Sequence, residues 1–185
     1  LFKEMMQDPG LKGKFLFAEK SGIEIMKKVV NATDVWVSMP RCTREACGTS
    51  DQRAALTGGY NIATATGGPV EYIIHGKTGW LMDPFAGWDL ARVVRGFDFK
   101  DPWFIAQYKK QAQILLGRYL EEAMTRYYRY VDEGNHQWTD GLKLSMEKAY
   151  KKVSIHVMTR KYEILFLNVL NGKGVEGFKE DVENL

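Results

Sequence analysis

Residues 34–71 decide the predicted fold, and they read DVWVSMPRCTREACGTSDQRAALTGGYNIATATGGPVE. Two runs within this stretch, at 35–37 and 60–66, have the apolar and β-branched composition of strands. The segment 51–56 between them has the composition of a short helix that starts after a hydroxyl-bearing N-cap. The pair Gly58-Gly59 then ends that helix. The stretch therefore predicts a strand, a helix and a second strand in succession.

Further strand and helix patterns flank this stretch. Residues 14–18 form a short apolar run, after which Ser21 and Glu24 make a capping-box pair for a helix that ends near Asn31. Downstream, Pro69 fits the first position of a short helix, and residues 80–82 predict a short strand at a sheet edge. Strand, helix and strand at this spacing indicate right-handed parallel crossovers. We therefore predict an α/β fold with a Rossmann-like parallel sheet.

The chain changes character after Asp83-Pro84, where strand patterns stop. Helical patterns predict helices over 88–96, from the Asp101 cap to Gly134, over 138–152, and from the Ser154 cap to Leu170. The long second helix carries an apolar stripe that we expect to pack as core: Phe104, Tyr108, Ala112, Leu115, Tyr119, Ala123, Tyr127 and Tyr130. We predict a partial Rossmann-like lobe over 1–100 and a helical extension over 101–185 that packs on it.

The composition argues against several classes of protein. The 185-residue chain carries a net charge of only +3, and its basic residues are mixed with acidic ones, so we expect no nucleic-acid partner. No run approaches the roughly 18–20 apolar residues of a membrane span, so we expect no membrane partner and a cytoplasmic location. Cys42 and Cys47 are interpreted as reduced thiols, and the three histidines lie far apart in the sequence, so we expect no metal site.

Polar residues gather where two predicted strands end, which is where parallel α/β sheets bind ligands. Each of the two loops leads into a helix start, whose free amides and positive dipole end favour a phosphate. Arg53 can add a bidentate contact to phosphate oxygens, and the carboxylate of Glu45 suits two neighbouring sugar hydroxyls. Glu71 is a candidate for another hydroxyl pair or for a helix cap. We predict a site for a sugar joined to a phosphate, built from Arg44, Glu45, Gly48, Thr49, Ser50, Arg53, Gly67, Gly68 and Glu71.

The same motifs carry a resemblance to a known family. Residues 34–40, with an Asp-Val-Trp-Val strand and Pro40, and residues 45–50, Glu-Ala-Cys-Gly-Thr-Ser, are similar to the strand, proline loop and Glu-Ala-Ser-Gly-Thr-Ser turn of α-glucan phosphorylases. Residues 67–71 and 76–81 look like the glycine-rich pattern of sugar-nucleotide transferases such as glycogen and starch synthases. Residues 11–84 therefore resemble the carboxyl-terminal lobe of GT-B retaining glycosyltransferases.

The resemblance implies roles for individual residues. The lobe over 1–100 would bind the donor, and Glu45 would be the catalytic-site residue that binds hydroxyls of the donor hexose. Gly48 and Thr49 would present backbone amides to the hexose and the donor phosphates. Glu71 matches a less uniform position of the family pattern.

Arg53 departs from both family patterns. Phosphorylases carry at this position the lysine that forms a Schiff base with pyridoxal phosphate, whereas a guanidinium stays protonated and forms no imine. Many sugar-nucleotide transferases carry a second glutamate there, which contacts the ribose. We therefore expect no pyridoxal phosphate and no other cofactor, with the sugar nucleotide acting as a substrate.

The family's Arg and Lys clamp on the donor diphosphate, and its amino-terminal acceptor domain, have no counterpart in these residues. We therefore expect the chain to be part of a larger enzyme and to be inactive alone. The expected reaction is retaining transfer of glucose from a sugar nucleotide to an α-glucan or related sugar. Three alternatives stay open: a phosphorylase-like enzyme that uses inorganic phosphate without pyridoxal phosphate, a non-catalytic sugar-binding module, and a purely structural helical domain.

Overall fold

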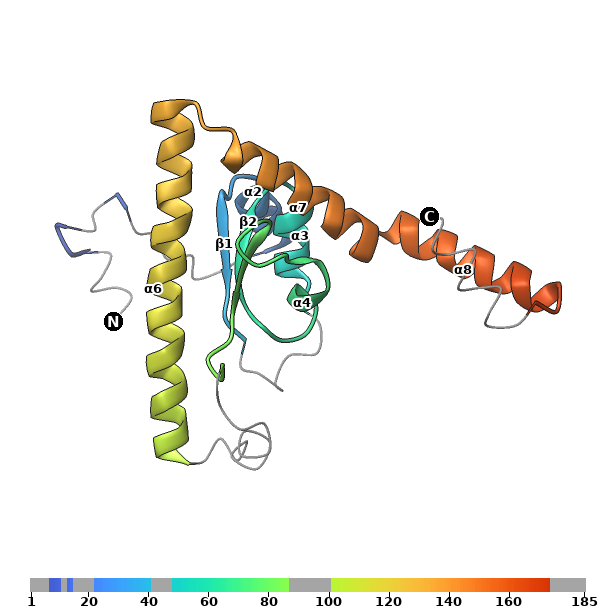
Figure 1. Ribbon diagram of the computed structural model, residues 1–185, viewed down its shortest axis with the longest axis horizontal. Helices are drawn as coiled ribbons and strands as arrows, with labels where there is room; N and C mark the ends of the chain where they lie inside the picture. The colour runs from blue at the N-terminus through green and yellow to red at the C-terminus, as the bar shows by residue number, and fades with distance from the viewer. Residues whose placement is uncertain (1–6, 11–12, 15–21, 41–47, 87–100, 174–185) are drawn as a thin grey trace.

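A small parallel sheet lies at the centre of the computed structural model, which describes residues 7–10, 13, 14, 22–40, 48–86 and 101–173. Its strands in this part of the chain are β1 (Val35–Ser38), β2 (Tyr60–Thr64) and β3 (Gly79–Met82), in the order β1-β2-β3 (Figure 1). Both strand pairs are parallel, with Val35 opposite Tyr60 and Asn61 opposite Gly79. The predicted α/β class and the edge position of residues 80–82 are therefore confirmed within the described chain.

Short helices make the crossovers between these strands. Helix α3 (Ser50–Leu56) joins β1 to β2, and α4 (Pro69–Tyr72) joins β2 to β3. Pro69 occupies the first turn of α4, as predicted, because a residue without an N–H loses nothing there. Helix α2 (Ile23–Asn31) precedes β1, and its N-cap is Gly22. The apolar run predicted at 14–18 lies outside the described residues except for Lys14. The helix predicted at 88–96, Cys42 and Cys47 also lie outside them.

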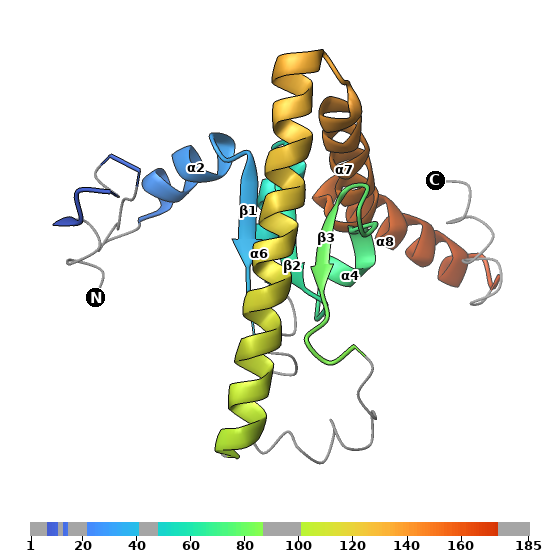
Figure 2. The same ribbon diagram turned by 60° about the vertical axis from the view of Figure 1, so that its left-hand side comes forward.

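The central strand β2 differs from its prediction. The strand was expected to extend over 60–66, but it ends at Thr64, and all five of its residues are buried. The physical reason is that helices cover both faces of the sheet, so both sets of alternating side chains lose contact with water. Helix α6 (Pro102–Glu133) packs on one face, and α3 with α7 (Gln137–Val153) covers the other (Figures 1 and 2).

Two apolar clusters correspond to these two faces. On the α6 face, Tyr60, Ile62 and Trp80 are buried together with Tyr119 and Ala123 of the long helix. On the other face, the buried cluster contains Ala55, Ala63, Tyr72, Ile73 and Ala149. Helices from residues 101–153 therefore supply part of the core of the sheet. The division of the chain into two domains at residue 100 stays a prediction.

The long helix α6 begins and ends where its cap residues predicted. The Asp101 side chain accepts a hydrogen bond from the Trp103 backbone N–H at 2.9 Å, and Gly134 ends the helix in the left-handed conformation with φ of 65°. Most of the predicted stripe is buried or half-buried: Phe104, Tyr108, Ala112, Leu115, Tyr119, Ala123 and Tyr130. Tyr127 is an exception, because it is 37% exposed at the edge of the packed face.

The last described helix, α8 (Ile155–Leu170), starts at Ser154, whose hydroxyl accepts a hydrogen bond from the His156 N–H, as predicted. It contacts the end of α7 and extends away from the sheet (Figure 1). Several of its large apolar side chains are at least half exposed: Ile155, Tyr162, Phe166, Leu167, Val169 and Leu170. No helix in the described part of the chain is long and apolar enough to cross a membrane.

Candidate functional site at the strand ends

The strand-end edge is the side of the sheet where β1 ends at Ser38 and β2 ends at Thr64. Parallel strands end on the same side, so the chain that follows β1 and the chain that follows β2 leave the sheet at this edge. Residues 48–50 enter α3, and residues 67 and 68 enter α4. Five of the predicted site residues, Gly48, Thr49, Ser50, Gly67 and Gly68, are therefore found at the starts of the two crossover helices.

A buried aspartate ties the two helix starts together. Asp51, in the first turn of α3, is only 1% exposed, and its Oδ2 accepts a hydrogen bond from the Tyr72 hydroxyl of α4 at 3.1 Å. The Asp51 backbone carbonyl accepts a second hydrogen bond, at 2.9 Å, from the side-chain amide of Asn61 in β2. These contacts fix α3 and α4 against each other and against the central strand. The sequence analysis assigned no role in the site to Asp51, Tyr72 or Asn61.

The backbone at this edge has the features that a close approach by a ligand requires. Gly67 has φ of 61°, a conformation that favours glycine, and Gly68 is the N-cap residue of α4. Thr49 is the N-cap residue of α3, which agrees with the predicted hydroxyl-bearing N-cap, but its side chain makes no cap hydrogen bond. Gly68 has no side chain to make one either. The start of α3 can therefore offer first-turn amides to another hydrogen-bond acceptor. The start of α4 offers fewer, because Pro69 has no N–H and the Glu71 N–H already donates to the Gly68 carbonyl at 2.9 Å.

For three of the predicted site residues, the structure leaves the predicted ligand contact as a prediction. Arg44 and Glu45 lie outside the described residues, so their roles stay predictions. Glu71 is exposed on α4. Its predicted contact with a sugar hydroxyl also stays a prediction.

Arg53 lies between α3 and α2. With Ile23, Met26 and Val30 of α2 and Thr57 it lines a mostly apolar hollow of about 360 Å³. Its side chain is exposed, and a guanidinium is not the amine that a Schiff base requires. The residue present at this position therefore does not fit a pyridoxal phosphate bound through a Schiff base. Its proposed phosphate contact stays a prediction.

No cluster of three or more histidine, cysteine, aspartate or glutamate side chains suited to a metal ion occurs among the described residues. The polar groups at the strand-end edge are instead backbone amides and hydroxyls, and the Asp51–Tyr72 pair is buried. Such groups bind ligands by hydrogen bonds and by the helix dipole. The fold is that of a parallel α/β protein, and phosphate binding at this edge stays a prediction.

Comparison with known proteins points to one kind of enzyme. The chain is 28% identical over 159 residues to a maltodextrin phosphorylase of Thermococcus litoralis. The matched residues make up 86% of this chain and 17% of that protein. It is 32% identical over 79 residues to a glycogen phosphorylase of Aquifex aeolicus. Here the matched residues make up 43% of this chain and 11% of that protein. No family model matches the chain, and no solved structure matches it.

These similarities are distant, and the chain spans less than a fifth of the length of either relative. They agree with the GT-B resemblance at the level of the superfamily, since both relatives are phosphorylases. They do not single out a sugar-nucleotide glucosyltransferase.

Proposed function

We propose that this chain is the part of a larger enzyme that binds inorganic phosphate and the glucosyl unit that is transferred to it from an α-glucan. The observation that carries the proposal is the strand-end edge, where Asp51 and Tyr72 hold two helix starts together beside Gly48–Ser50 and Gly67-Gly68. The distant similarity to two phosphorylases favours phosphate over a sugar nucleotide. The reaction moves the terminal glucosyl unit from the glucan chain to a phosphate oxygen.

The chemistry that this edge offers is positioning and stabilisation of charge. Backbone amides of residues 48–50 and of Gly67 and Gly68 would bind phosphate oxygens, and Arg44 would add positive charge. Glu45 would accept hydrogen bonds from two hydroxyls of the hexose and so orient it for transfer. Arg53 would contribute a protonated guanidinium near the phosphate and no covalent chemistry. No cofactor is part of this proposal.

A second candidate function is transfer of glucose from a sugar nucleotide to the glucan. It is favoured by the sequence of residues 67–71 and 76–81, which look like the glycine-rich pattern of glycogen and starch synthases. The same backbone amides would then bind the donor diphosphate. A cytoplasmic location is proposed for either enzyme, since both act on storage glucans and their phosphorylated sugars.

Product analysis of the complete protein tests these candidates. We expect maltoheptaose with inorganic phosphate to give glucose 1-phosphate without added nucleotide, and UDP-glucose or ADP-glucose to give no chain extension. Extension from a sugar nucleotide alone would replace the first candidate by the second. Glucan binding without turnover would indicate a sugar-binding module. The chain over 1–185 alone is expected to show no transfer, and turnover by it would contradict the view that other parts of the enzyme complete the site.

Substitutions test the roles proposed for Glu45 and Arg53. Glu45→Gln is expected to lower kcat/KM by roughly 10- to 100-fold, because a hydrogen bond to a charged group is lost. Glu24→Gln is the matched control, since Glu24 is an exposed acid on α2 that pairs with Lys27 at 3.0 Å. Unchanged activity of both Glu45→Ala and Arg53→Ala would instead support a purely structural role for this chain.

A further inference from the structure

Helix α4, which follows the end of β2, consists of a single turn, Pro69–Tyr72. A helix this short does not hold its own orientation, so contacts with the rest of the protein decide how it lies. Its exposed acid, Glu71, comes three residues after Gly68, which at the rise of an α-helix places it about 4.5 Å along the axis from the strand-end edge. The orientation of α4 therefore decides where the Glu71 carboxylate points.

Tyr72 anchors α4 to α3. Its side chain is 2% exposed and belongs to a buried cluster with Ala55 and Ala149. Its hydroxyl donates to the Asp51 Oδ2 at 3.1 Å, and the Asp51 carbonyl in turn accepts a hydrogen bond from the Asn61 side-chain amide of β2 at 2.9 Å. Tyr72 is therefore fixed at its ring by apolar packing and at its hydroxyl by a hydrogen bond.

Thr78 anchors the chain that leaves α4. Its side chain is fully buried, and its Oγ1 accepts a hydrogen bond from the Ile74 backbone N–H at 2.7 Å and donates to the Tyr72 carbonyl at 3.5 Å. The Thr78 backbone N–H donates to the Ile74 carbonyl at 2.9 Å. The loop is therefore closed on itself just before β3, which begins at Gly79. Rotation of α4 about its axis would break these hydrogen bonds and the one from Tyr72 to α3.

Glu71 is the neighbour of Tyr72 in this turn, and successive residues of an α-helix lie about 100° apart around its axis. Because Tyr72 is fixed in the core, the direction in which Glu71 leaves the helix is fixed as well, and Glu71 is exposed. Within the described part of the chain its carboxylate makes no ion pair and accepts no hydrogen bond. It is therefore an oriented acceptor that is available to a ligand.

We propose that Tyr72, held by Asp51 and Thr78, is a positioning residue that aims the Glu71 carboxylate at hydroxyls of the transferred glucosyl unit. The proposal rests on the proposed function, because the sugar is that of the same site. A carboxylate accepts hydrogen bonds and repels an anion, so at this place it selects sugar hydroxyls and not phosphate oxygens. An acceptor that is oriented before the sugar arrives costs less conformational entropy on binding. Tyr72 and Thr78 would thus contribute to the choice of sugar without touching it.

A double-mutant cycle in the complete protein, with maltoheptaose and inorganic phosphate, tests whether Tyr72 acts through Glu71. Glu71→Gln is expected to lower kcat/KM by roughly 10- to 100-fold, because hydrogen bonds to a charged group are lost. Tyr72→Phe is expected to lower kcat/KM by about fivefold in the unaltered protein and by less than about twofold in the Glu71→Gln background. An equal decrease in both backgrounds is the result for a purely structural Tyr72 and would overturn the proposal. Tyr150→Phe, the matched control at an exposed tyrosine of α7, is expected to leave kcat/KM unchanged, and thermal unfolding confirms that each variant is folded in the assay.

Sugar analogues give a second readout, which a loss of stability would not change. In the direction of glucan synthesis, the unaltered protein is expected to use glucose 1-phosphate better than at least one deoxy analogue that lacks a single hydroxyl. Tyr72→Phe and Thr78→Val are expected to reduce this preference by about fivefold and to leave KM for inorganic phosphate unchanged in phosphorolysis. Thr78→Ser keeps the hydroxyl and is expected to retain the preference. An unchanged preference in either Tyr72→Phe or Thr78→Val, or equal use of all analogues by the unaltered protein, would overturn the proposal.

The same cycle separates this proposal from the proposed function. Additive effects of Tyr72→Phe and Glu71→Gln in a protein that forms glucose 1-phosphate would overturn the positioning role and leave the function standing. Coupled effects in a protein that transfers glucose only from a sugar nucleotide would support the positioning role and reject phosphate as the reaction partner. In a protein without turnover the cycle is measured as maltoheptaose affinity by calorimetry, where coupling supports the positioning role and additivity overturns it. Neither turnover nor binding of maltoheptaose would overturn both.

Discussion

The strand-end edge and the opposite edge of the sheet differ in how the chain builds them. The strand-end edge comes from one continuous stretch, residues 34–71, and consists mainly of backbone amides, glycines and hydroxyls. At the opposite edge, two adjoining hollows of about 490 and 510 Å³ lie where α6 and the start of α7 meet the Gly76–Gly79 turn, and we call them together the amino-edge groove. The groove comes from three segments that are far apart in sequence, around residues 76–77, 118–129 and 135–144, and consists of long polar side chains. A surface of the first kind is visible as a motif, whereas a surface of the second kind exists only after helices α6 and α7 have packed on the sheet.

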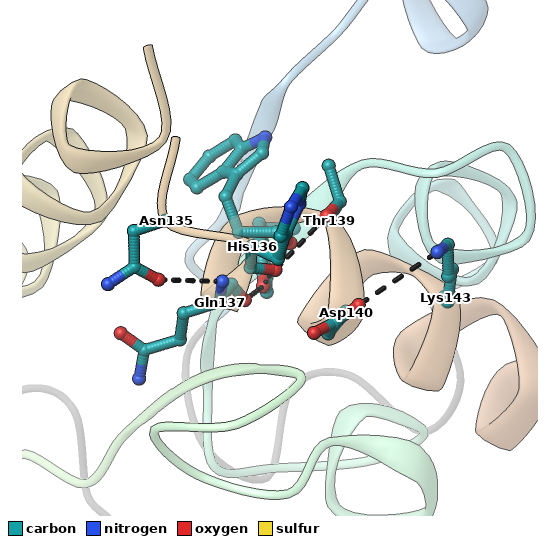
Figure 3. Close-up of polar contacts among 8 residues, drawn as sticks. Asn135, His136, Gln137, Thr139, Asp140 and Lys143 are labelled. Carbon is teal, nitrogen blue, oxygen red and sulfur yellow. Dashed lines mark hydrogen bonds and ion pairs between the residues drawn. The ribbon is translucent and has the colours of Figure 1, made fainter. Parts of the chain in front are cut away.

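Short-range contacts hold the α7 side of the groove. The Asn135 side-chain oxygen accepts a hydrogen bond from the Gln137 backbone N–H at 2.9 Å, and the Asp140 carboxylate lies 3.9 Å from the Lys143 ammonium (Figure 3). The partners are two or three residues apart in sequence, so these contacts hold the start of α7 together without placing it against the sheet.

The two regions also respond differently to substitution. Residues at the strand ends are held by strand pairing and by the buried Asp51–Tyr72 contact. The groove depends on how closely α7 approaches Tyr60 and the Gly76–Gly79 turn, because its lining residues come from both sides of that contact. Changes in helix packing are therefore expected to affect the groove first.

The largest effect is expected at Gly141, where α7 lies against the start of β2. A Cβ at this position would overlap the Tyr60 hydroxyl and lie 2.7 Å from the Lys77 carbonyl oxygen. Tyr60 is buried and donates to the Trp138 carbonyl at 2.9 Å, so it has little room to move. We expect Gly141→Ala to lower the free energy of unfolding by about 3 kcal/mol in urea denaturation.

A matched substitution in the other long helix, α6, is expected to change the free energy of unfolding in the opposite direction. A Cβ at Gly117 of α6 meets nothing within 4 Å. Gly117→Ala is therefore expected to raise the free energy of unfolding by about 0.5–1 kcal/mol, as alanine does in an exposed helix interior. Stabilisation by both substitutions would contradict the close packing of α7 on Tyr60.

The next effect tests the strand-end edge. Tyr72→Phe removes the hydroxyl that donates to Asp51 and leaves a buried carboxylate oxygen without that donor, so we expect a loss of about 2 kcal/mol in the free energy of unfolding. Tyr150→Phe on α7 is the control, because Tyr150 is 48% exposed, and a change within about 0.5 kcal/mol is expected. An equal loss in both variants would contradict the buried hydrogen bond between Tyr72 and Asp51.

A smaller effect is expected in the titration of Tyr60 beneath the groove. Burial raises the pKa of the Tyr60 phenol, and the Arg126 guanidinium acts in the opposite direction. Because the folded-state pKa lies above the unfolded value, this phenol adds stability that is present below the unfolded pKa and is lost as pH rises through the folded pKa. Arg126→Met is expected to raise the pKa further, as measured by tyrosinate absorbance. Arg129→Met, the control, is expected to leave it unchanged.

The smallest effect is expected on the solvent side of α7, outside both regions. The Lys151 ammonium, 2.8 Å from Glu147, holds the pKa of that carboxyl below its usual value. The pair therefore adds stability above the unfolded pKa of the carboxyl, and this is lost as pH falls through the folded pKa. Lys151→Met is expected to return the pKa toward its usual value in an NMR titration. Lys152→Met at the next position is the control, and an equal shift there would show a general charge effect.

Local signals predicted much of the fold. Asp101 and Pro102 gave the start of α6, Gly134 gave its end, and Ser154 gave the start of α8. Each of these signals depends on the chemistry of one or two residues close in sequence: a side-chain acceptor for free amides, or a glycine in a left-handed conformation. Such signals do not depend on what the helix packs against. They can therefore be found without a structure.

Other features could not be found in this way. Burial of β2 on both faces required α6 and α7 to meet the sheet from opposite sides, and the exposure of Tyr127 depends on where the edge of that packing falls. Asp51 was visible as an acid in a helix start, but its hydrogen bond to Tyr72 joins residues from different crossovers. The signal that could have found the pair is the shared buried position of an acid and a phenol, which sequence spacing alone does not show.

The sequence by itself determined the parallel α/β class, the order of the elements and the glycines and hydroxyls at the strand ends, because these follow from local conformational preferences along 34–82. Only the tertiary structure decided that Asp51 and Tyr72 join the two helix starts and that Arg126, Gln137 and Asp140 line one groove. The physical reason is the distance along the chain over which each kind of interaction acts. Backbone preferences act over a few residues, whereas a shared hydrogen bond or groove requires the packing of side chains from distant parts of the chain.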